Sequence, residues 1–251
     1  LGTNRNKRSL TCDIAQPEGQ QLIRDLVKHC DVFIENFKVG DMARYGLDYA
    51  SLSAINPRLV YCSVTGFGQT GPYKDRAGYD YAIQGIGGLM SITGERDDLG
   101  GGPQKVGVAV ADLFTGMYAT VAILAALRHA ERTGEGQHLD MALLDVQVAM
   151  LANQASNELV GHTHPTRMGN AHPNIVPYQV FEASDGYIIV ATGNDGQYAA
   201  RAGPGESPLR PCHQLVAFVD ELVLELRGRR RVAGDRLPLA VMNASGSWNG
   251  R

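Results

Sequence analysis

The sequence predicts an α/β fold in which a parallel β-sheet is flanked by helices. Short β-type runs alternate with stretches of helical periodicity, which is the pattern of βαβ units. The chain has 251 residues, of which 44% are hydrophobic and 20% charged, a composition typical of globular proteins. This length suits one large domain or two small ones.

The first βαβ unit is expected in the N-terminal part of the chain. Pro17 suits the first turn of a helix whose apolar positions recur at helical spacing up to Cys30. Residues 32–34 read as a buried strand, and residues 59–64 read as the next strand after a short helical stretch. Because no strand is evident before Leu10, the sheet is expected to be incomplete at its N-terminus.

Two glycine-rich segments follow these strands. Residues 65–72 admit two interpretations, a loop that cradles phosphate or a tight connection, because glycine permits close backbone approach and positive φ. Their spacing matches neither a Walker motif nor a GxGxxG fingerprint. Residues 85–88 are expected to permit close packing of helices or backbone segments.

Asp112 stands where a predicted buried strand, residues 105–111, meets a predicted helix. The helix is indicated by large apolar residues at helical spacing, with small residues between them: Leu113, Met117, Val121, Leu124 and Leu127. A carboxylate at this place is expected to cap the helix and, through the helix dipole, to favour its charged form. Ligands bind in the crevice beyond the strand ends of open α/β sheets, so Asp112 is either a nucleophile or only a cap.

A further strand-and-helix unit and a hairpin complete the recognisable elements. Residues 137–143 read as a strand, and a helix is expected after it. Residues 178–182 and 187–191 flank the turn Ala183-Ser184-Asp185-Gly186, which predicts a β-hairpin. After Tyr198 the periodicity is lost, and the rest of the chain is expected to be poorly specified and partly disordered.

Composition argues against several classes of function. The net charge is −3 with no basic stripe, so nucleic-acid binding is not expected. No apolar stretch reaches spanning length without a glycine or a charge, so no membrane helix is expected. His162, His164 and His172 share a loop, but zinc would need a fourth ligand and a tighter pattern. The four cysteines are far apart and form no metal-type pair, which suits a cytoplasmic or organelle-matrix location.

Several segments, in their order and spacing, resemble the family III CoA-transferases, the CaiB/BaiF family. The matching segments lie between Asn4 and Tyr198 and are Asn4–Ser9, Ile34–Lys38, Thr65–Pro72, Ala77–Asp80, Val110–Gly116 and Gly134–Gln137. Within the family, Gly169–His172 together with Ile175–Gln179 is most similar to the succinyl-CoA:glutarate (dicarboxylate) branch.

The resemblance implies a domain organisation. Residues 1–160 would form a large Rossmann-like CoA-transferase domain truncated at its N-terminus, since the family's first strand and early active-site residues would precede Leu1. Residues 161–198 would be a linker and the start of a small domain. Residues 199–251 would be an atypical tail unlike the family, for which a shift of reading frame is one hypothesis.

The resemblance also implies a site. Asp112 matches the catalytic aspartate of the family, and further positions match its CoA contacts: Asp13, Ile14, Asn36, Phe37, Lys38, Arg44, Gly78, Tyr79 and Asp80. Phe37 would pack on adenine, and the cations of Lys38 and Arg44 would meet phosphate oxygens. No metal and no permanently bound cofactor are implied, because coenzyme A enters as a substrate thioester.

The implied reaction is transfer of coenzyme A from an acyl-CoA such as succinyl-CoA to a carboxylic acid, dicarboxylic in this branch. It would proceed through an aspartyl-CoA thioester at Asp112. Two alternatives stay open: a 2-methylacyl-CoA racemase, whose branch has histidine at the position of Tyr79, and an inactive CoA-binding fragment. The family forms interlocked homodimers, and weaker or failed assembly is expected for this chain because both of its ends are altered.

Overall fold

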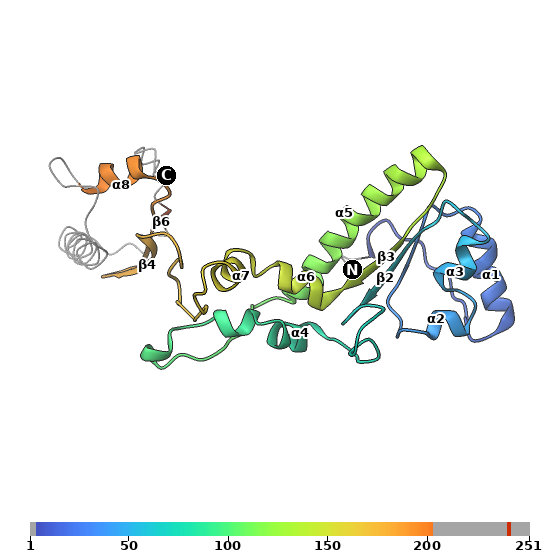
Figure 1. The fold of residues 1–251 in the computed structure, drawn as a ribbon, viewed down its shortest axis with the longest axis horizontal. Helices are drawn as coiled ribbons and strands as arrows, with labels where there is room; N and C mark the ends of the chain where they lie inside the picture. Colours follow the sequence, from blue (N-terminus) through green and yellow to red (C-terminus); the bar gives the residue numbers. More distant parts are fainter. Residues whose placement is uncertain (1–3, 203–239, 242–251) are drawn as a thin grey trace. The chain divides into compact units, whose positions relative to one another are not determined.

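The computed structural model describes residues 4–202 and 240–241 of the chain (Figure 1). The chain divides into two compact units. The first unit is formed by the residues up to 93 together with residues 103–165, and the second by residues 94–102 together with the residues from 166 onward. Each unit is described below by itself.

The first unit is built on a parallel sheet of three strands. They are β1 (Val32–Glu35), β2 (Val60–Thr65) and β3 (His138–Ala142), in the order β1-β2-β3. Cys62 in the central strand pairs with Ile34 on one side and Leu139 on the other. The α/β class, the parallel sheet and the places of these strands are therefore confirmed, although Ile34 is 60% exposed and β1 is not fully buried.

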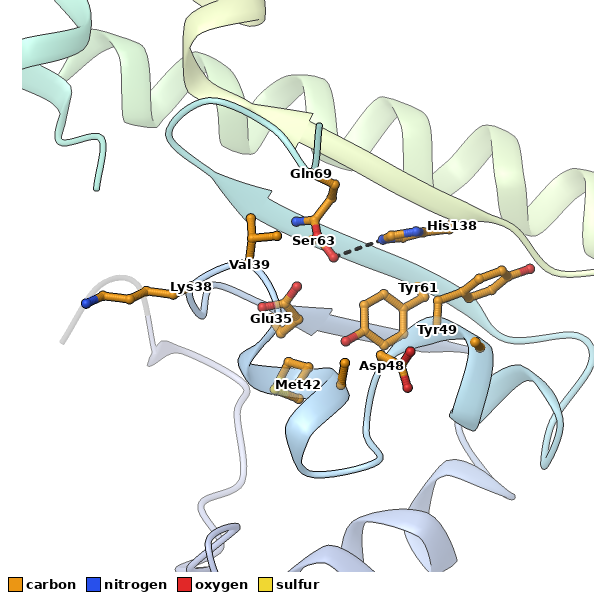
Figure 2. Close-up of a pocket in the computed structure, with 13 residues that line it drawn as sticks. Glu35, Lys38, Val39, Met42, Asp48, Tyr49, Tyr61, Ser63, Gln69 and His138 are labelled. Carbon is orange, nitrogen blue, oxygen red and sulfur yellow. Dashed lines mark hydrogen bonds between the residues drawn. The ribbon is translucent and has the colours of Figure 1, made fainter. Parts of the chain in front are cut away.

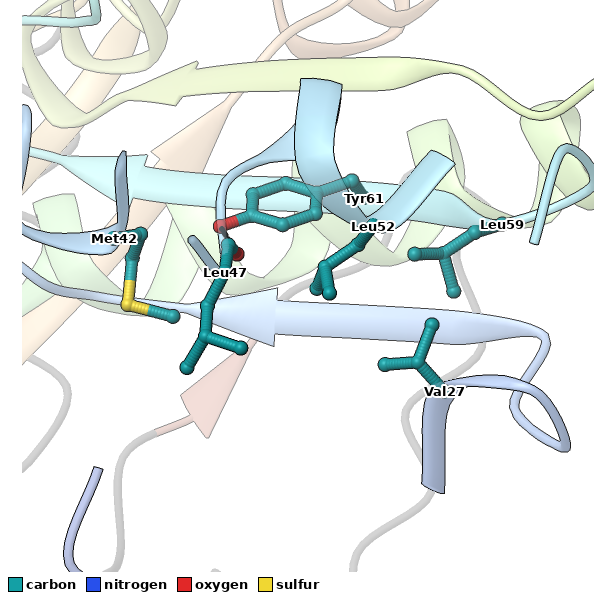
Figure 3. Close-up of a cluster of buried hydrophobic side chains, with 6 residues drawn as sticks. All are labelled: Val27, Met42, Leu47, Leu52, Leu59 and Tyr61. Atoms are coloured by element: carbon teal, nitrogen blue, oxygen red, sulfur yellow. Dashed lines mark hydrogen bonds between the residues drawn. The ribbon is translucent and has the colours of Figure 1, made fainter. Parts of the chain in front are cut away.

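One face of the sheet is covered by three short helices, α1 (Pro17–Val27), α2 (Asp41–Arg44) and α3 (Tyr49–Ser53) (Figure 1). Side chains of these helices, of β2 and of the connections before α3 and β2 form one buried cluster, shown in Figure 3: Val27, Met42, Leu47, Leu52, Leu59 and Tyr61. The hydroxyl of Tyr61 donates to the carbonyl of Leu47 at 3.0 Å, so burial leaves no unpaired donor there. Each such side chain contributes about 1.5–3 kcal/mol through burial.

The long helix α5 (Val110–Thr133) packs with α4 (Asp80–Ile86) and α6 (Leu143–Ala149) on the first unit's other layer (Figure 1). The side of α5 that faces the sheet carries small residues, which allow close packing. The buried residues of the helix are Ala111, Thr115, Ala119, Ala126 and Ala130. The large apolar residues that predicted the helix lie on its outer side and are exposed by more than half: Leu113, Met117, Val121 and Leu124. The helix is confirmed, but its small residues face the sheet.

By length and composition, α5 is apolar enough to cross a membrane, with a mean hydropathy of 1.7 over its most apolar window. Asp112 and Gly116 interrupt this stretch, as expected, but its average hydropathy stays high. The same test is passed by core helices of water-soluble proteins, and α5 packs against β2, β3, α4 and α6.

Residues 105–111 do not form the buried strand that their composition predicts. The segment is mostly exposed and irregular, and α5 already begins at Val110. The N–H of Val106 donates to Oε1 of Gln84 at 2.9 Å instead of joining a sheet. A β-type run becomes a strand only where a neighbouring strand offers its own backbone groups, and no strand of the described part of the chain pairs with this segment.

The helical region after β3 is divided. The sequence predicts one helix, whereas the structure has α6 and then α7 (Ala152–Leu159). Ala152 has φ of +48°, in the left-handed region that a continuous right-handed helix cannot contain. Short 3₁₀ helices, η2 (Leu89–Ile92) and η3 (Asp97–Leu99), lie in the long connection between α4 and α5.

The second unit contains the predicted β-hairpin. β4 (Tyr178–Ala183) and β5 (Gly186–Ala191) pair antiparallel, which confirms the hairpin. β6 (Ala240–Val241) adds to β5 in parallel, and α8 (Asp195–Ala202) follows the hairpin. Most of the predicted tail, residues 203–239 and 242–251, lies outside the described residues.

Candidate active site

Part of the predicted site lies around the carboxyl edge of the parallel sheet. α5 ends at Thr133 and leads through Gly134 into the start of β3, so the beginning of α5 lies toward the opposite, carboxyl ends of the strands (Figure 1). This edge is where open α/β sheets bind ligands. Asp112, in the first turn of α5, therefore lies in the region where the sequence predicts a site.

Asp112 does not cap its helix, contrary to expectation. The N-cap residue is Ala109, which has no side-chain cap, and Asp112 is the third residue of α5. The N–H of Val110 donates to the Val108 carbonyl at 2.8 Å, and the N–H of Ala111 donates to Oδ1 of Asp80 at 2.8 Å. The helix start is therefore held by other groups, and the Asp112 carboxylate is not used as a cap.

The surroundings of Asp112 disfavour its charged form. Partial burial, and then the negative charge of Asp80, raise the pKa of Asp112 above the ordinary value. These two effects oppose the helix dipole, which was expected to favour the charged form. This burial is only partial, because within the single chain Asp112 stays accessible to solvent beside the exposed side chains of Leu113 and Phe114.

Asp80 links the start of α5 to α4. Its Oδ1 accepts from the Ala111 N–H at 2.8 Å, and its Oδ2 accepts from the amide of Gln84 at 2.7 Å. Gln84 is fully buried and accepts in turn from the N–H of Val106 at 2.9 Å. Tyr79, the N-cap of α4, is 76% exposed.

The glycine-rich segment 65–72 is held tightly beside these residues. A Cβ atom added at Gly66 would lie 2.4 Å from the Cα of Gly78, so both positions need glycine. The N–H of Gly68 donates to Thr65 Oγ1 at 3.0 Å, and the N–H of Gln69 donates to Asp140 Oδ2 at 2.8 Å. Because these N–H groups are paired within the protein, the structure favours a tight connection over a phosphate cradle.

The predicted CoA contacts after β1 lie at the same edge. The side-chain amide of Asn36 donates to the carbonyl of Val64 at the end of β2. Phe37 is 46% exposed and Lys38 is exposed, so both side chains are accessible to a ligand. The carboxyl ends of β1 and β2 thus connect three parts of the predicted site, which are Asn36–Lys38, Gly78–Asp80 and Asp112.

The remaining predicted contacts lie with α1 and α2. Asp13 is exposed, and its carboxylate accepts from the Ala15 N–H at 2.9 Å. Ile14 packs against the cluster of Figure 3. Arg44 is exposed, with its guanidinium 4.7 Å from the centre of the Tyr45 ring. The hydrogen bonds and packing contacts of these three residues do not join them to Asp112.

A pocket that the sequence did not indicate lies between the sheet and α2 and α3 (Figure 2). Its cavity volume is about 290 Å³, and its lining includes Glu35, Ser63 and His138. Oγ of Ser63 lies 2.9 Å from Nε2 of His138, and the His138 ring stacks on Tyr49 at 5.3 Å. The available sequence signal was the period of two in β2, which places Tyr61 and Ser63 on one face.

The histidine loop shows no metal centre. His164 lies 3.2 Å from Glu158 and is 87% exposed. Among residues 4–202 and 240–241, no three His, Cys, Asp or Glu side chains are placed to hold a metal ion.

The chain is similar in sequence to known CoA-transferases. The chain is 62% identical over 196 residues to a succinate–glutarate CoA-transferase of Agrobacterium fabrum, a match that covers 78% of this chain and 48% of the relative. It is 46% identical over 199 residues to the human succinyl-CoA:glutarate CoA-transferase, which covers 79% of this chain and 45% of the human protein. The chain thus spans about half the length of these relatives.

Solved structures show the same fold. A CaiB/BaiF family protein from Brucella suis superposes with a TM-score of 0.73 at 50% sequence identity, covering 91% of this chain and 61% of that one. Rv3272 from Mycobacterium tuberculosis superposes with a TM-score of 0.72 at 26% identity, covering 90% of this chain and 62% of that one. The family model described as CoA-transferase family III matches residues 1–205. Because this match covers more than half of its length, the chain belongs to CoA-transferase family III.

Proposed function

We propose that the whole protein transfers coenzyme A from an acyl-CoA such as succinyl-CoA to a dicarboxylic acid. The observation that carries the proposal is the state of Asp112: it lies in the first turn of α5, takes no part in capping, and has a raised pKa. The names of relatives with 62% and 46% identity support succinyl-CoA as donor and a dicarboxylate such as glutarate as acceptor.

In the proposed reaction, the Asp112 carboxylate attacks the thioester carbonyl of the donor. The C–S bond breaks, which gives a mixed anhydride and a CoA thiolate that stays bound. The thiolate then attacks the aspartyl carbonyl of the anhydride, forming an aspartyl-CoA thioester and releasing the donor acid. An acceptor carboxylate reverses these steps. This covalent catalysis divides one difficult exchange into easier ones and requires neither a metal nor a redox cofactor.

The raised pKa of Asp112 suits this role. A carboxylate whose charge is poorly stabilised is a stronger base, and it gains more by forming a bond to an acyl carbon. The N–H groups of Val110 and Ala111 already have partners, so the N–H of Asp112 itself is the candidate donor to an oxyanion at the helix start.

For the CoA moiety, we propose contacts along the carboxyl edge of the sheet and beyond it. The exposed ring of Phe37 packs on adenine, while Lys38 and Arg44 supply cations for phosphate oxygens. Asn36 and Gly78 are proposed to line the site in close contact with the CoA moiety. Further contacts are proposed for the positions that remain accessible, Asp13, Ile14 and Tyr79.

The outer face of α5 is proposed to be covered by a second copy of the chain. Leu113, Met117, Val121 and Leu124 form an exposed apolar stripe that continues directly from Asp112. A homodimer, interlocked as in the family, would bury this stripe and remove water from Asp112. Exclusion of water matters because anhydride and thioester intermediates hydrolyse easily.

The racemase alternative is less well supported. It needs an acid–base pair that moves a proton at the α-carbon, and Tyr79 stands where that branch has histidine. A tyrosine, with an ordinary pKa of about 10, is a poor base near neutral pH. The third alternative, an inactive CoA-binding fragment, requires no catalytic residues, so only the experiment below tests it.

The test is trapping with hydroxylamine during incubation with succinyl-CoA and a panel of dicarboxylates. A transferase gives a hydroxamate on the peptide that contains Asp112, and Asp112→Asn gives none. A racemase exchanges the α-proton of an acyl-CoA in deuterated water without forming a hydroxamate. An inert fragment does neither, and either of these last two outcomes refutes the proposal.

A cytoplasmic or organelle-matrix location is also proposed. Cys12, Cys30 and Cys62 are free thiols, as expected in a reducing compartment. Fractionation of cells that express the full protein would test it, and recovery from an oxidising compartment would contradict it.

A further inference from the structure

Asp80 has the contacts of a residue that serves Asp112 rather than those of a residue that faces a ligand. Both of its oxygens accept hydrogen bonds from the chain, Oδ1 from the Ala111 N–H at 2.8 Å and Oδ2 from the Gln84 amide at 2.7 Å. Ala111 is fully buried and directly precedes Asp112. We propose that Asp80 is a positioning residue that fixes the first turn of α5, and with it the place and the charge of the Asp112 carboxylate. This proposal rests on the function proposed for Asp112 above.

The anchor is built from three segments. Gln84, fully buried on α4, donates to Asp80 and accepts from the Val106 N–H at 2.9 Å. Three hydrogen bonds therefore join α4 to the start of α5 and to the connection before it. Two of these bonds involve the buried amide of Gln84. Because Ala109 provides no side-chain cap, Asp80 supplies from another helix the acceptor that α5 lacks locally.

The charge of Asp80 has a second effect on the same site. It adds to burial in raising the pKa of Asp112. The elements packed against α5 carry other titratable side chains, none of which is among the causes of the shift: Tyr81 on α4, Tyr61 and Cys62 on β2, His138 and Asp140 on β3, and Asp145 on α6. The hydrogen bonds of Asp80 thus fix the start of α5, and its charge adds to the larger effect of burial in raising the pKa of Asp112.

Two variants separate the anchor from the charge. Asp80→Ala removes both. The double variant Asp80→Asn with Gln84→Glu preserves the pattern of hydrogen bonds: the new amide oxygen accepts from Ala111, its NH₂ donates to the new carboxylate, and that carboxylate still accepts from Val106. It moves the negative charge one side chain farther from Asp112. Asp145→Asn, which removes an exposed first-turn aspartate from α6, is the matched control.

The first readout is NMR of the full chain, and it needs no turnover. Carboxyl-labelled aspartate gives the titration of Asp112, assigned with Asp112→Asn, and amide exchange gives the protection of Ala111. We expect Asp80→Ala to speed exchange at Ala111 and to lower the titration midpoint of Asp112. The double variant should keep Ala111 protected and still lower the midpoint, and the control should change neither. Unchanged protection in Asp80→Ala, or an unchanged midpoint in the double variant, overturns the proposal.

The second readout is the rate of acylation of Asp112 by succinyl-CoA, followed as trapped hydroxamate. Misplacement of the nucleophile in Asp80→Ala should lower the maximal rate roughly 10- to 100-fold with little change in KM. A loss confined to KM would identify Asp80 as a CoA contact and overturn the positioning role. If no hydroxamate forms even with the unaltered chain, the transferase function fails, while the NMR readouts still decide the role of Asp80.

Discussion

The backbone N–H of Gln69 donates a 2.8 Å hydrogen bond to Oδ2 of Asp140, which joins the glycine-rich segment 65–72 to β3. The segment begins where β2 ends and passes beside Gly78, so its position determines one wall of the candidate site. A side chain of the neighbouring strand thus sets the course of a loop that has no regular structure of its own.

Removal of the Asp140 carboxylate should loosen this loop without unfolding the protein. Because Asp140 is exposed, water replaces the lost acceptor, and the expected cost of Asp140→Ala is about 1 kcal/mol. Hydrogen exchange at Gln69 should become faster, while that of β3 should not. Equal exchange at Gln69 in the variant and the unaltered chain would show that the bond does not hold the loop.

Gly66 should not tolerate a side chain. Its Cβ would lie 2.4 Å from the Cα of Gly78, and this contact is with backbone, which cannot move aside cheaply. Gly66→Ala should destabilise the fold by about 1–3 kcal/mol, measured by urea denaturation. Gly107→Ala is the matched control, because nothing lies within 4 Å of its added Cβ. A loss of stability in Gly66→Ala no greater than that in the control would contradict the close approach.

The Asp112 carboxylate should destabilise the folded protein at neutral pH. Its pKa in the folded state lies above the unfolded value, so charging it opposes folding. The cost is absent when the group is protonated in both states, and it appears as the pH rises through the unfolded and then the folded pKa. Asp112→Asn should therefore be more stable than the unaltered chain at pH 7, with a gain that shrinks toward about pH 4. Urea denaturation at both pH values tests this, and a gain that grows on acidification would refute it.

Cys62 should be unreactive in the folded chain. Burial, aided by the charge of Glu35, raises the pKa of the Cys62 thiol to about 11, so little thiolate exists near neutral pH. Iodoacetamide at pH 8 should label Cys12, which is only partly buried, before Cys62. After denaturation the two should react at similar rates. Early labelling of Cys62 in the native protein would contradict its burial in β2.

A charge on the outer face of α5 should prevent self-association. Val121 is 66% exposed, so Val121→Lys leaves the fold of the single chain intact and places an ammonium in the proposed dimer interface. Analytical ultracentrifugation should show a lower dimer fraction than for the unaltered chain. Arg128→Glu, at an exposed polar position of the same helix, is the control. Equal dimerisation of both variants would exclude the apolar stripe from the interface.

Much of the fold was predictable because its signals are local. Pro17 suits the first turn of α1, and the hydrophobic runs at 32–34 and 59–64 match β1 and β2. The turn Ala183–Gly186 carries the residue types that a hairpin needs, and β4 and β5 pair around it. Each of these elements depends on residues that are neighbours in the chain.

Other predictions failed where distant residues decide the outcome. Residues 105–111 have a strand-like composition, but the Val106 N–H donates its hydrogen bond to the side chain of Gln84 on α4 instead of to a strand. Asp112 has the position of a cap, but the start of α5 is held by Asp80, which lies 31 residues before Ala111. The pocket of Figure 2 joins Ser63 to His138, 75 residues apart, and no local pattern connects them.

By itself, the sequence determined the α/β class and the parallel strands, because periodicity and turn chemistry depend on consecutive residues. Motif spacing also pointed to Asp112, the aspartate that we propose as the nucleophile. Tertiary structure alone decided which groups surround that aspartate. It placed the carboxylate of Asp80 at the start of α5 and turned the large apolar residues of α5 away from the sheet. Those outcomes depend on close packing and electrostatic interaction between segments that only folding brings together.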